Sequence, residues 1–244
     1  MRLAVIACLV LSREISYEVA ISGNSAMTFF LPQGLHNTPD ILRSEIQKKI
    51  DEIENYSNEK RDENNQFDAI VLGYGLCSNG VSGLKTKSLR LIIPRCDDCI
   101  ALFMGSQEKY LDYFHKNIGS YYLNAGWMEN AIIPSKSDRK RRYNEFAEFY
   151  GEENAQYLID QTYGYINNYK NFTYIKSCVF DDANFLEQAK KNAAEFDMPL
   201  NVAAADNSFI KKLINGPFSD EDFVVVEPGK TTIPTGDVKK LEII

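Results

Sequence analysis

Four short runs of uninterrupted apolar residues constrain the fold of this chain more than any other feature. They are Leu3–Leu11, Ala69–Tyr74, Leu89–Pro94 and Phe223–Val226. An apolar run without polar alternation suits a strand that is covered on both faces, so each run is expected to be a central strand of a mostly parallel sheet. Two weaker strands are expected at Thr173–Val179 and Leu200–Ala204.

Amphipathic segments alternate with these strands. Apolar residues recur at helical spacing within Ile41–Ile53, Cys99–His115, Phe185–Phe196 and Ser208–Ile214, and a polar link at Asn55–Gln66 follows the first of these segments. This alternation predicts a doubly wound α/β fold with helices on both faces of the sheet. The 244 residues are interpreted as a single α/β domain, with two halves at about 1–134 and 170–244.

The segment 135–169 differs from both halves. It begins with a basic cluster, Arg139–Arg142, and continues with eight aromatic residues: Tyr143, Phe146, Phe149, Tyr150, Tyr157, Tyr163, Tyr165 and Tyr169. We predict two helices that join near Gly151 and are inserted between the halves. The aromatic side chains form either the packing stripe of this hairpin or a functional face, which covers the site as a lid or joins two copies in a homo-oligomer.

Charge and cysteine content restrict the class of protein. The 27 basic and 34 acidic residues give a net charge of −7, which argues against a nucleic-acid or anionic-membrane partner. The first apolar run is too short to span a bilayer, and Arg13 and Glu14 follow it at once, so neither a membrane anchor nor a leader is expected. We therefore expect a cytoplasmic, reduced protein. Five cysteines in a chain of this size argue against disulfides and leave metal binding, catalysis or burial.

Cysteine residues lie in or just after three of the predicted strands. Cys8 lies in the first strand, Cys77 follows the second, and Cys96 and Cys99 follow the third. Ligands of open α/β sheets bind beyond the carboxyl ends of the strands, so these sulfur atoms are expected to meet at one edge. His36 precedes a helix and is expected at the same edge.

Thiolates and an imidazole at one place point to a transition metal. Zinc takes such ligands in tetrahedral sets, and an iron–sulfur cluster prefers four thiolates. The C-x-x-C spacing of Cys96 and Cys99 allows both to reach one ion. Zinc is the expected cofactor and an iron–sulfur cluster the second candidate. A redox pair, a reactive thiol at a helix start and inert buried cysteines stay open as alternatives.

Further side chains are predicted to line this site as ligand-binding residues: Tyr74, Asn79, Arg95, Asp98, Trp127 and Glu129. The glycine-rich segment Gly73–Gly83 matches neither the dinucleotide fingerprint nor the P-loop, so it is interpreted as a tight turn that presents a cysteine and Asn79.

Several of these residues have structural alternatives. Asp97 and Asp98 are an acid–base pair, partners of a metal ligand, or a helix cap. Arg95 contacts either an anionic ligand or an acidic side chain. Cys178 is assigned to the core of the far half, and the sequence assigns no catalytic residue.

Several segments resemble the uncharacterised domain-of-unknown-function family number sixteen thirty-eight. They are Leu31-Pro32 with Leu35–Asn37, Gly73–Gly80, Ile93–Arg95 with Asp98–Ile100, Gly105-Ser106, and Gly119–Tyr122 with Gly126–Glu129. The family occurs in methanogens and anaerobic bacteria, often encoded beside corrinoid-dependent methyltransferases. Its members often carry another residue at Cys96, so the resemblance favours Cys8, His36, Cys77 and Cys99 as the core ligand set.

The resemblance implies a metal-binding protein in corrinoid-linked methyl or one-carbon metabolism. A corrinoid protein or a methyltransferase is then the implied partner, and a corrinoid a further implied cofactor. Two alternatives stay open. One is a non-catalytic module that binds a corrinoid or a small metabolite. The other is a metal-free enzyme with Cys77 or Cys99 as its nucleophile.

Overall fold

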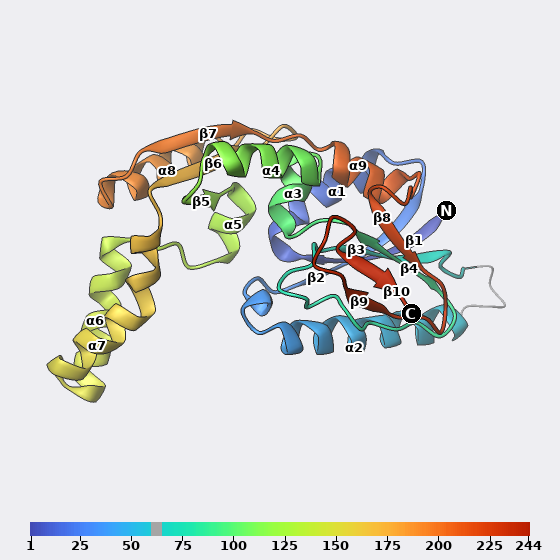
Figure 1. Cartoon of the computed structure of the whole chain (residues 1–244), viewed down its shortest axis with the longest axis horizontal. Helices are drawn as coiled ribbons and strands as arrows, with labels where there is room; N and C mark the ends of the chain where they lie inside the picture. Colours follow the sequence, from blue (N-terminus) through green and yellow to red (C-terminus); the bar gives the residue numbers. More distant parts are fainter. Residues whose placement is uncertain (60–64) are drawn as a thin grey trace. The chain divides into compact units, whose positions relative to one another are not determined.

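The computed structural model describes residues 1–59 and 65–244, and these form two compact units. The first unit comprises Met1–Leu111 with Ala205–Ile244, and the second comprises Asp112–Ala204 (Figure 1). The sequence predicts one domain with a different division, at 134 and 170. Part of the polar link predicted at Asn55–Gln66 lies outside the described residues.

The first unit contains a five-stranded sheet in the order β2-β1-β3-β4-β8 (Figure 1). The strands are β1 (Arg2–Cys8), β2 (Ser25–Leu31), β3 (Ala69–Gly73), β4 (Arg90–Pro94) and β8 (Phe223–Val226). All neighbours pair in parallel except β4 and β8, which are antiparallel. The mostly parallel α/β sheet is confirmed, with β1, β3 and β4 as its central strands. The prediction of a central strand at Phe223–Val226 is wrong in its placement, because β8 is an antiparallel strand at the edge. The first strand is shorter than predicted, because the chain turns into a 3-10 helix, η1 (Leu9–Leu11), directly after Cys8.

Helices cover both faces of this sheet. They are α1 (Ser12–Ile21), α2 (Pro39–Glu59), α3 (Cys99–Met104) and α9 (Ser208–Asn215), with a short 3-10 helix η2 (Leu35–Asn37) before α2. Helix α4 (Gln107–Lys116) begins in the first unit and ends in the second. Helix α2 lies along one face, and α1 and α9 pack together on the other (Figure 1). The single helix predicted at Cys99–His115 is wrong, because Gly105 adopts a left-handed φ of 88° and ends α3.

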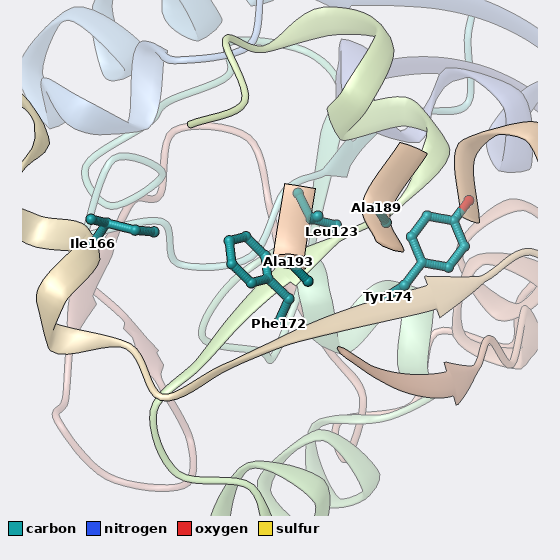
Figure 2. Packing of buried hydrophobic residues seen from close by; sticks show 6 residues of the cluster. All are labelled: Leu123, Ile166, Phe172, Tyr174, Ala189 and Ala193. Atoms are coloured by element: carbon teal, nitrogen blue, oxygen red, sulfur yellow. The ribbon is translucent and has the colours of Figure 1, made fainter. Parts of the chain in front are cut away.

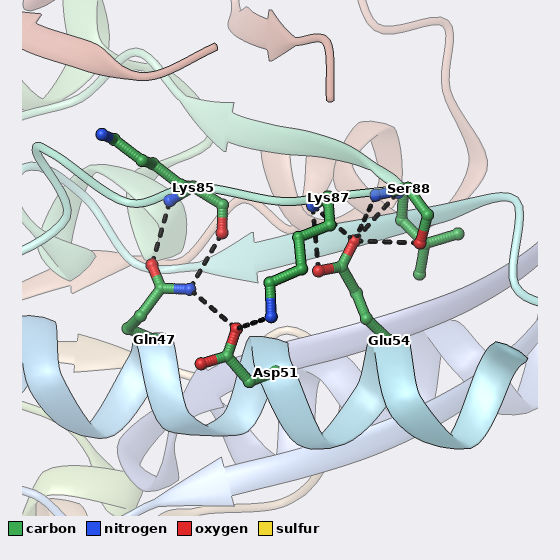
Figure 3. Close-up of polar contacts among 7 residues, drawn as sticks. Gln47, Asp51, Glu54, Lys85, Lys87 and Ser88 are labelled. Carbon is green, nitrogen blue, oxygen red and sulfur yellow. Dashed lines mark hydrogen bonds and ion pairs between the residues drawn. The ribbon is translucent and has the colours of Figure 1, made fainter. Parts of the chain in front are cut away.

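Helix α2 fastens the loop that leads into β4 (Figure 3). The buried carboxylate of Glu54 accepts hydrogen bonds from the backbone amides of Lys87, Ser88 and Leu89, the shortest at 2.7 Å. Two turns earlier, Gln47 exchanges hydrogen bonds with the backbone of the same loop. The polar face of α2 therefore fixes the start of β4, while its apolar face covers the sheet.

The second unit contains a three-stranded parallel sheet in the order β5-β6-β7. Its elements are β5 (Ser120–Leu123), α5 (Ala125–Asn130), β6 (Asn171–Lys176), α8 (Ala183–Glu195), β7 (Leu200–Ala204) and a 3-10 helix, η4 (Gly164–Asn168). Its core consists of Leu123, Ile166, Phe172, Tyr174, Ala189 and Ala193 (Figure 2). The two weaker strands are confirmed, but they form this separate sheet.

The predicted helical hairpin is present as α6 (Lys136–Tyr150) and α7 (Glu152–Tyr163), which join at Gly151. Every residue of α6 lies within the described part of the chain, and none of them is buried. Phe149 is 77 % exposed, and Tyr150 and Tyr157 are exposed as well. These three aromatic side chains are therefore not part of a packing stripe, whereas Tyr163 is buried at the base of the hairpin.

A short antiparallel pair, β9 (Thr232–Pro234) and β10 (Leu241–Ile243), completes the first unit. Within the described ranges, no helix combines the length and the apolar character that crossing a bilayer would require.

Candidate thiol site

Four buried cysteines lie at or just beyond the carboxyl ends of three adjacent strands. Cys8 is the last residue of β1, Cys77 follows β3, and Cys96 and Cys99 follow β4, with Cys99 as the first residue of α3. Because β1, β3 and β4 are parallel neighbours, their carboxyl ends lie along one edge of the sheet. The structure thus collects in one unit four sulfur atoms that are remote in the sequence.

The thiols are close enough to influence one another electrostatically. Burial raises the pKa of Cys77, and the charges of Asp98 and Cys8 raise it further. Burial also raises the pKa of Cys99, to which Cys77, Asp98, Cys8 and Cys96 each add. A negative charge on any one of these thiols or on Asp98 disfavours the thiolate form of its neighbours. The cluster therefore holds its thiols neutral unless a cation is present to stabilise the thiolates.

Backbone amides also point at two of the sulfur atoms. Cys77 accepts hydrogen bonds from the amides of Gly75 and Cys99, and both lower its pKa. Cys8 accepts from the amides that open η1, which lower its pKa in the same way. The rise in pKa caused by burial is larger than the fall caused by these hydrogen bonds, so the pKa of each thiol remains raised. Such amides stabilise a thiolate once a positive charge has offset the cost of burial.

Two hydrogen bonds join the loops that carry the cysteines. The amide of Leu76 donates to the carbonyl of Cys96 at 2.7 Å, and the amide of Cys77 donates to the carbonyl of Asp97 at 2.9 Å. The loop after β3 is thereby paired with the loop after β4. This pairing fixes the position of Cys77 relative to the C-x-x-C segment.

The backbone around Cys77 is strained and closely packed. A Cβ atom at Gly75 would lie 2.6 Å from the backbone of Asp98, so only glycine fits there. Cys77, Ser78 and Asn79 then adopt φ values of 46°, 58° and 67° in the left-handed region. Such conformations cost roughly 1–3 kcal/mol per residue, and they cluster at functional sites where the surroundings enforce them.

Tyr74 ends the apolar run of β3 and lies among the thiols. Its side chain is 3 % exposed, and its hydroxyl oxygen has no hydrogen-bond partner among the described residues. Burial raises the pKa of this hydroxyl, and the charges of Cys8, Cys77 and Cys99 raise it further. The tyrosine is therefore a buried, unsatisfied donor next to three thiols.

Asp98 performs the structural role of a helix cap. Its Oδ1 atom accepts a hydrogen bond from the amide of Ile100 at 2.8 Å, and its Oδ2 atom accepts one from the hydroxyl of Tyr110 at 3.2 Å. Burial raises the pKa of Asp98, and the charge of Asp97 adds to this, whereas its hydrogen bonds oppose it. Asp97 lies apart from this cap, because it forms an ion pair with Lys240 at 2.7 Å.

Arg95 has partners that the sequence does not predict. Its guanidinium donates hydrogen bonds to the backbone carbonyls of Asp220, Phe223, Lys239 and Leu241. These hydrogen bonds fasten the C-terminal segment to the sheet. Burial lowers the pKa of Arg95, and the charges of Asp220 and Asp237 oppose this. The same segment supplies Lys240, whose charge lowers the pKa of Cys96 against the larger effect of burial. No pattern in the sequence identifies Lys240, since it is far from Cys96 along the chain.

The remaining predicted residues have different positions. His36 lies in η2 and is partly buried, and this burial lowers its pKa, which favours the neutral form that binds metals. Asn79 is exposed, so it does not share the burial of Cys77.

Three of the singled-out residues belong to the second unit. Trp127 and Glu129 lie on α5 in that unit. The assignment of Cys178 to the core is wrong, because this residue is exposed in the turn that follows β6.

In the part of the chain that the structure describes, no group of three or more His, Cys, Asp or Glu side chains is arranged so that it could hold a metal ion. The cysteines are neighbours by burial, by strand position and by their effect on one another's pKa, but they do not converge on one point. A metal would therefore require the side chains to reorient.

Comparison with known proteins adds one match. No curated protein and no solved structure matches the chain significantly. The model of a family described as "Protein of unknown function (DUF1638)" matches residues 30–214, a segment that includes His36, Cys77, Cys96 and Cys99 but begins after Cys8. This match covers more than half of the 244 residues and confirms the resemblance seen in the sequence. The chain therefore belongs to the DUF1638 family.

Proposed function

We propose that the chain binds a thiophilic metal ion, zinc in the first place, through Cys8, Cys77 and Cys99, with Cys96 or His36 as a further ligand. One observation carries this proposal: buried thiols from three adjacent parallel strands lie close enough to perturb one another. Sulfur is the preferred protein ligand of soft and borderline metals, and zinc takes thiolate and imidazole together.

The electrostatics of the cluster support a metal over a free nucleophile. A reactive cysteine needs a lowered pKa, whereas burial and neighbouring charges raise the pKa values of Cys77 and Cys99. A bound dication would reverse this preference and draw the thiols into their charged form. Zinc would act there as a Lewis acid that activates a thiol or a bound carrier of a methyl group.

An iron–sulfur cluster is the second candidate, because such a cluster prefers four thiolates and four of the cysteines are buried. A zinc–sulfur bond of about 2.3 Å places two thiolates of one tetrahedral ion roughly 3.8 Å apart. A four-iron, four-sulfur cluster spreads its four cysteines more widely, because each of them binds a different iron. The four buried cysteines, which influence one another's pKa, supply the thiols that either centre would need.

We further propose a role in corrinoid-linked methyl metabolism, with a corrinoid protein or a methyltransferase as partner. This proposal is supported by the family resemblance. Transfer of a methyl group to a thiol is a reaction that a thiolate-bound zinc promotes, so the proposed site suits this metabolism. A corrinoid-binding module without catalysis would instead co-purify with an intensely coloured cofactor and no zinc.

Metal analysis of anaerobically purified protein tests the proposal. The wild-type chain should carry about one zinc per chain, or the iron and brown absorption of a cluster. Cys77→Ser should lose the metal, since it removes a central ligand. The matched control Cys178→Ser should keep it, because that cysteine is exposed and lies in the other unit. Wild-type protein without metal, or Cys77→Ser with undiminished metal, would contradict the proposal.

A further inference from the structure

The helical hairpin of α6 and α7 has a cavity at its base. The cavity has a volume of about 280 Å³ and lies entirely within the second unit. Its lining is mostly apolar and aromatic with a single cation, and it includes Ile132, Arg142, Phe146, Thr162, Tyr163 and Tyr165. A lining of this kind suits an aromatic ring, which packs on apolar groups and attracts a guanidinium to its face. The chemistry of the cavity therefore points to an aromatic side chain as its occupant.

The tip of the same hairpin carries an exposed aromatic ring on the same side of α6. Phe149 is 77 % exposed, and its ring centre lies 6.4 Å from that of Tyr150. It follows Phe146 by three residues and Arg142 by seven, and residues at these spacings share one face of a helix. The exposed ring at the tip and the cavity at the base therefore lie on one face of the hairpin.

Phe149 cannot fill the cavity of its own chain. The hydroxyl of Tyr163 donates a hydrogen bond to Asp138, so the end of α7, where Thr162 lines the cavity, lies beside the start of α6. From Asp138 to Phe149 the helix rises roughly 16 Å, at 1.5 Å per residue. The two helices pack along each other and keep these ends apart (Figure 1). A ring that occupies the cavity must therefore come from another molecule.

We propose that this face of the hairpin binds the same face of a second copy of the chain. The two hairpins are antiparallel, and Phe149 of each copy inserts into the cavity of the other, where it packs on Phe146 and meets the guanidinium of Arg142. A two-fold axis near the middle of α6 makes every contact occur twice, so the assembly closes at two copies. The inference is independent of the proposed metal site, whose cysteines belong to the first unit.

Charge is divided along the hairpin in a way that fits this arrangement. The base carries the basic cluster Arg139–Arg142, and the tip carries Glu148, Glu152 and Glu153. Part of the basic cluster pairs with acidic side chains of the same hairpin. Over the ranges that the structure describes, Lys140 and the three glutamates of the tip form no ion pair, and all four are exposed. Antiparallel packing brings opposite charges together, whereas parallel packing would join like charges.

Sedimentation equilibrium over a range of concentrations tests the assembly. The faces are small, so we expect a dissociation constant on the order of 10 µM, with a dimer at about 200 µM and a monomer at about 1 µM. Phe149→Ala should raise this constant at least about 10-fold, because each of the two contacts loses its aromatic anchor. A wild-type chain that stays monomeric, or a Phe149→Ala variant that dimerises like the wild type, would overturn the inference.

Tyr157→Ala is the matched control. Its side chain is also an exposed aromatic, at 64 %, but it lies five residues from Thr162 and six from Tyr163, so it belongs to another face of α7. The dissociation constant of this variant should equal that of the wild type. An equal loss in Tyr157→Ala and Phe149→Ala would show that the association does not depend on the cavity, and would overturn the inference.

A cysteine trap tests the insertion itself, in a chain that also carries Cys178→Ser because Cys178 is the exposed native cysteine. Phe149→Cys and Thr162→Cys are prepared as separate variants, mixed and oxidised. The mixture should give a disulfide-linked dimer with one copy of each variant, because position 149 of one lies beside position 162 of the other. This mixed pair also retains one inserted Phe149. Either variant alone should give little linked dimer, since its two thiols would be more than about 10 Å apart.

The pattern of linked species separates this arrangement from other ways of pairing. Linkage of Phe149→Cys with itself, and not with Thr162→Cys, would show the two tips side by side and would refute the insertion. Absence of the mixed dimer, at a concentration where the wild type is dimeric, would place the interface elsewhere and would refute it too. Both substituted positions are exposed, so circular dichroism should show the helix content of the wild type in each variant.

Discussion

At the scale of single residues, the left-handed backbone of Cys77, Ser78 and Asn79 is the most unusual feature of the candidate thiol site. Three consecutive non-glycine residues in this region are unfavourable, so the surrounding contacts must enforce the conformation. The backbone bonds from Leu76 and Cys77 to the neighbouring loop provide this constraint. The strain places the sulfur of Cys77 in the interior while its two successors remain exposed.

Gly75→Ala tests whether the pairing of these loops matters. The added methyl would meet the backbone of Asp98 at 2.6 Å, so the two loops must separate. We expect a loss of about 1–3 kcal/mol in the free energy of unfolding, measured with urea. Gly23→Ala is the control, because nothing lies within 4 Å of its added atom. Equal stability of both variants would show that the loop contact is not tight.

The sequence predicts which residues lie at the ends of the strands. It does not predict which distant residues they contact. The order of apolar runs suffices to place Cys8 and Cys77 at the carboxyl ends of neighbouring strands. The partners of Arg95 lie more than a hundred residues away, and two of them, Asp220 and Lys239, are in irregular segments that no periodicity predicts. Cys178 was assigned to the core by residue type alone, yet it lies in an exposed turn where packing does not reach it.

At the scale of elements, helix α2 is tied to the loop before β4 by a single carboxylate. Glu54 is 2 % exposed and accepts hydrogen bonds from three consecutive backbone amides (Figure 3). Glu54→Ala would leave these donors unsatisfied in a buried place, and we expect a loss of about 3 kcal/mol in urea-induced unfolding. Glu52→Ala, an exposed position on the same helix, should change stability by less than about 0.5 kcal/mol. Similar losses in both variants would contradict this role of Glu54.

The base of the helical hairpin should be sensitive to acid. Burial raises the pKa of Asp138, but hydrogen bonds from Tyr163 and Arg141 and the charges of Arg141 and Arg142 lower it more, so its pKa lies below the ordinary value. A carboxylate with a lowered pKa in the folded state stabilises the fold above its unfolded pKa of about 3.9, and this stability disappears as the pH falls through the folded pKa.

Asp138→Asn checks this acid sensitivity. The variant should be less stable than the wild type at neutral pH and should lose less stability between about pH 5 and about pH 2, as followed by circular dichroism. Glu148→Gln, at an exposed position of α6, should retain the acid profile of the wild type. An unchanged profile in Asp138→Asn would show that this carboxylate does not contribute.

Elements with a strong pattern were predictable, and weakly patterned ones were predictable only in part, since β6 and β7 are as expected but β2 is not. The continuous runs of β3 and β4 and the hairpin turn at Gly151 are as predicted. Strand β2 was missed because its residues are mostly half-exposed at an edge. The break at Gly105 was missed because the apolar spacing continues across it, and spacing alone does not detect a left-handed glycine.

At the scale of the whole molecule, the chain forms two units with separate sheets and separate cores. Trp127, the only tryptophan, belongs to the second unit and reports on its unfolding. Phe172 is fully buried in the core of that unit (Figure 2), so Phe172→Ala should lower the free energy of unfolding seen by tryptophan fluorescence by about 3–5 kcal/mol. Phe149→Ala should have little effect, since that side chain is 77 % exposed. Equal effects would contradict this account of the core.

The fold class was predictable from the alternation of strands and helices, but the division of the chain was not. Nothing in the apolar pattern distinguishes strands that extend one sheet from strands that begin another. The second sheet is built from β5, β6 and β7, which lie between β4 and β8 in the chain. The apolar pattern of β8 predicts a buried strand but not its direction. The strand is antiparallel to β4 because of a connection that the sequence pattern does not encode.

The central claim is that Cys8, Cys77 and Cys99 together bind one metal centre. X-ray absorption at the edge of the metal that the protein carries, zinc or iron, measures the number and distance of the sulfur atoms around it. We predict at least three sulfur neighbours at about 2.3 Å, with one fewer protein sulfur or no bound metal in Cys77→Ser. A metal surrounded by nitrogen and oxygen atoms alone would contradict the account.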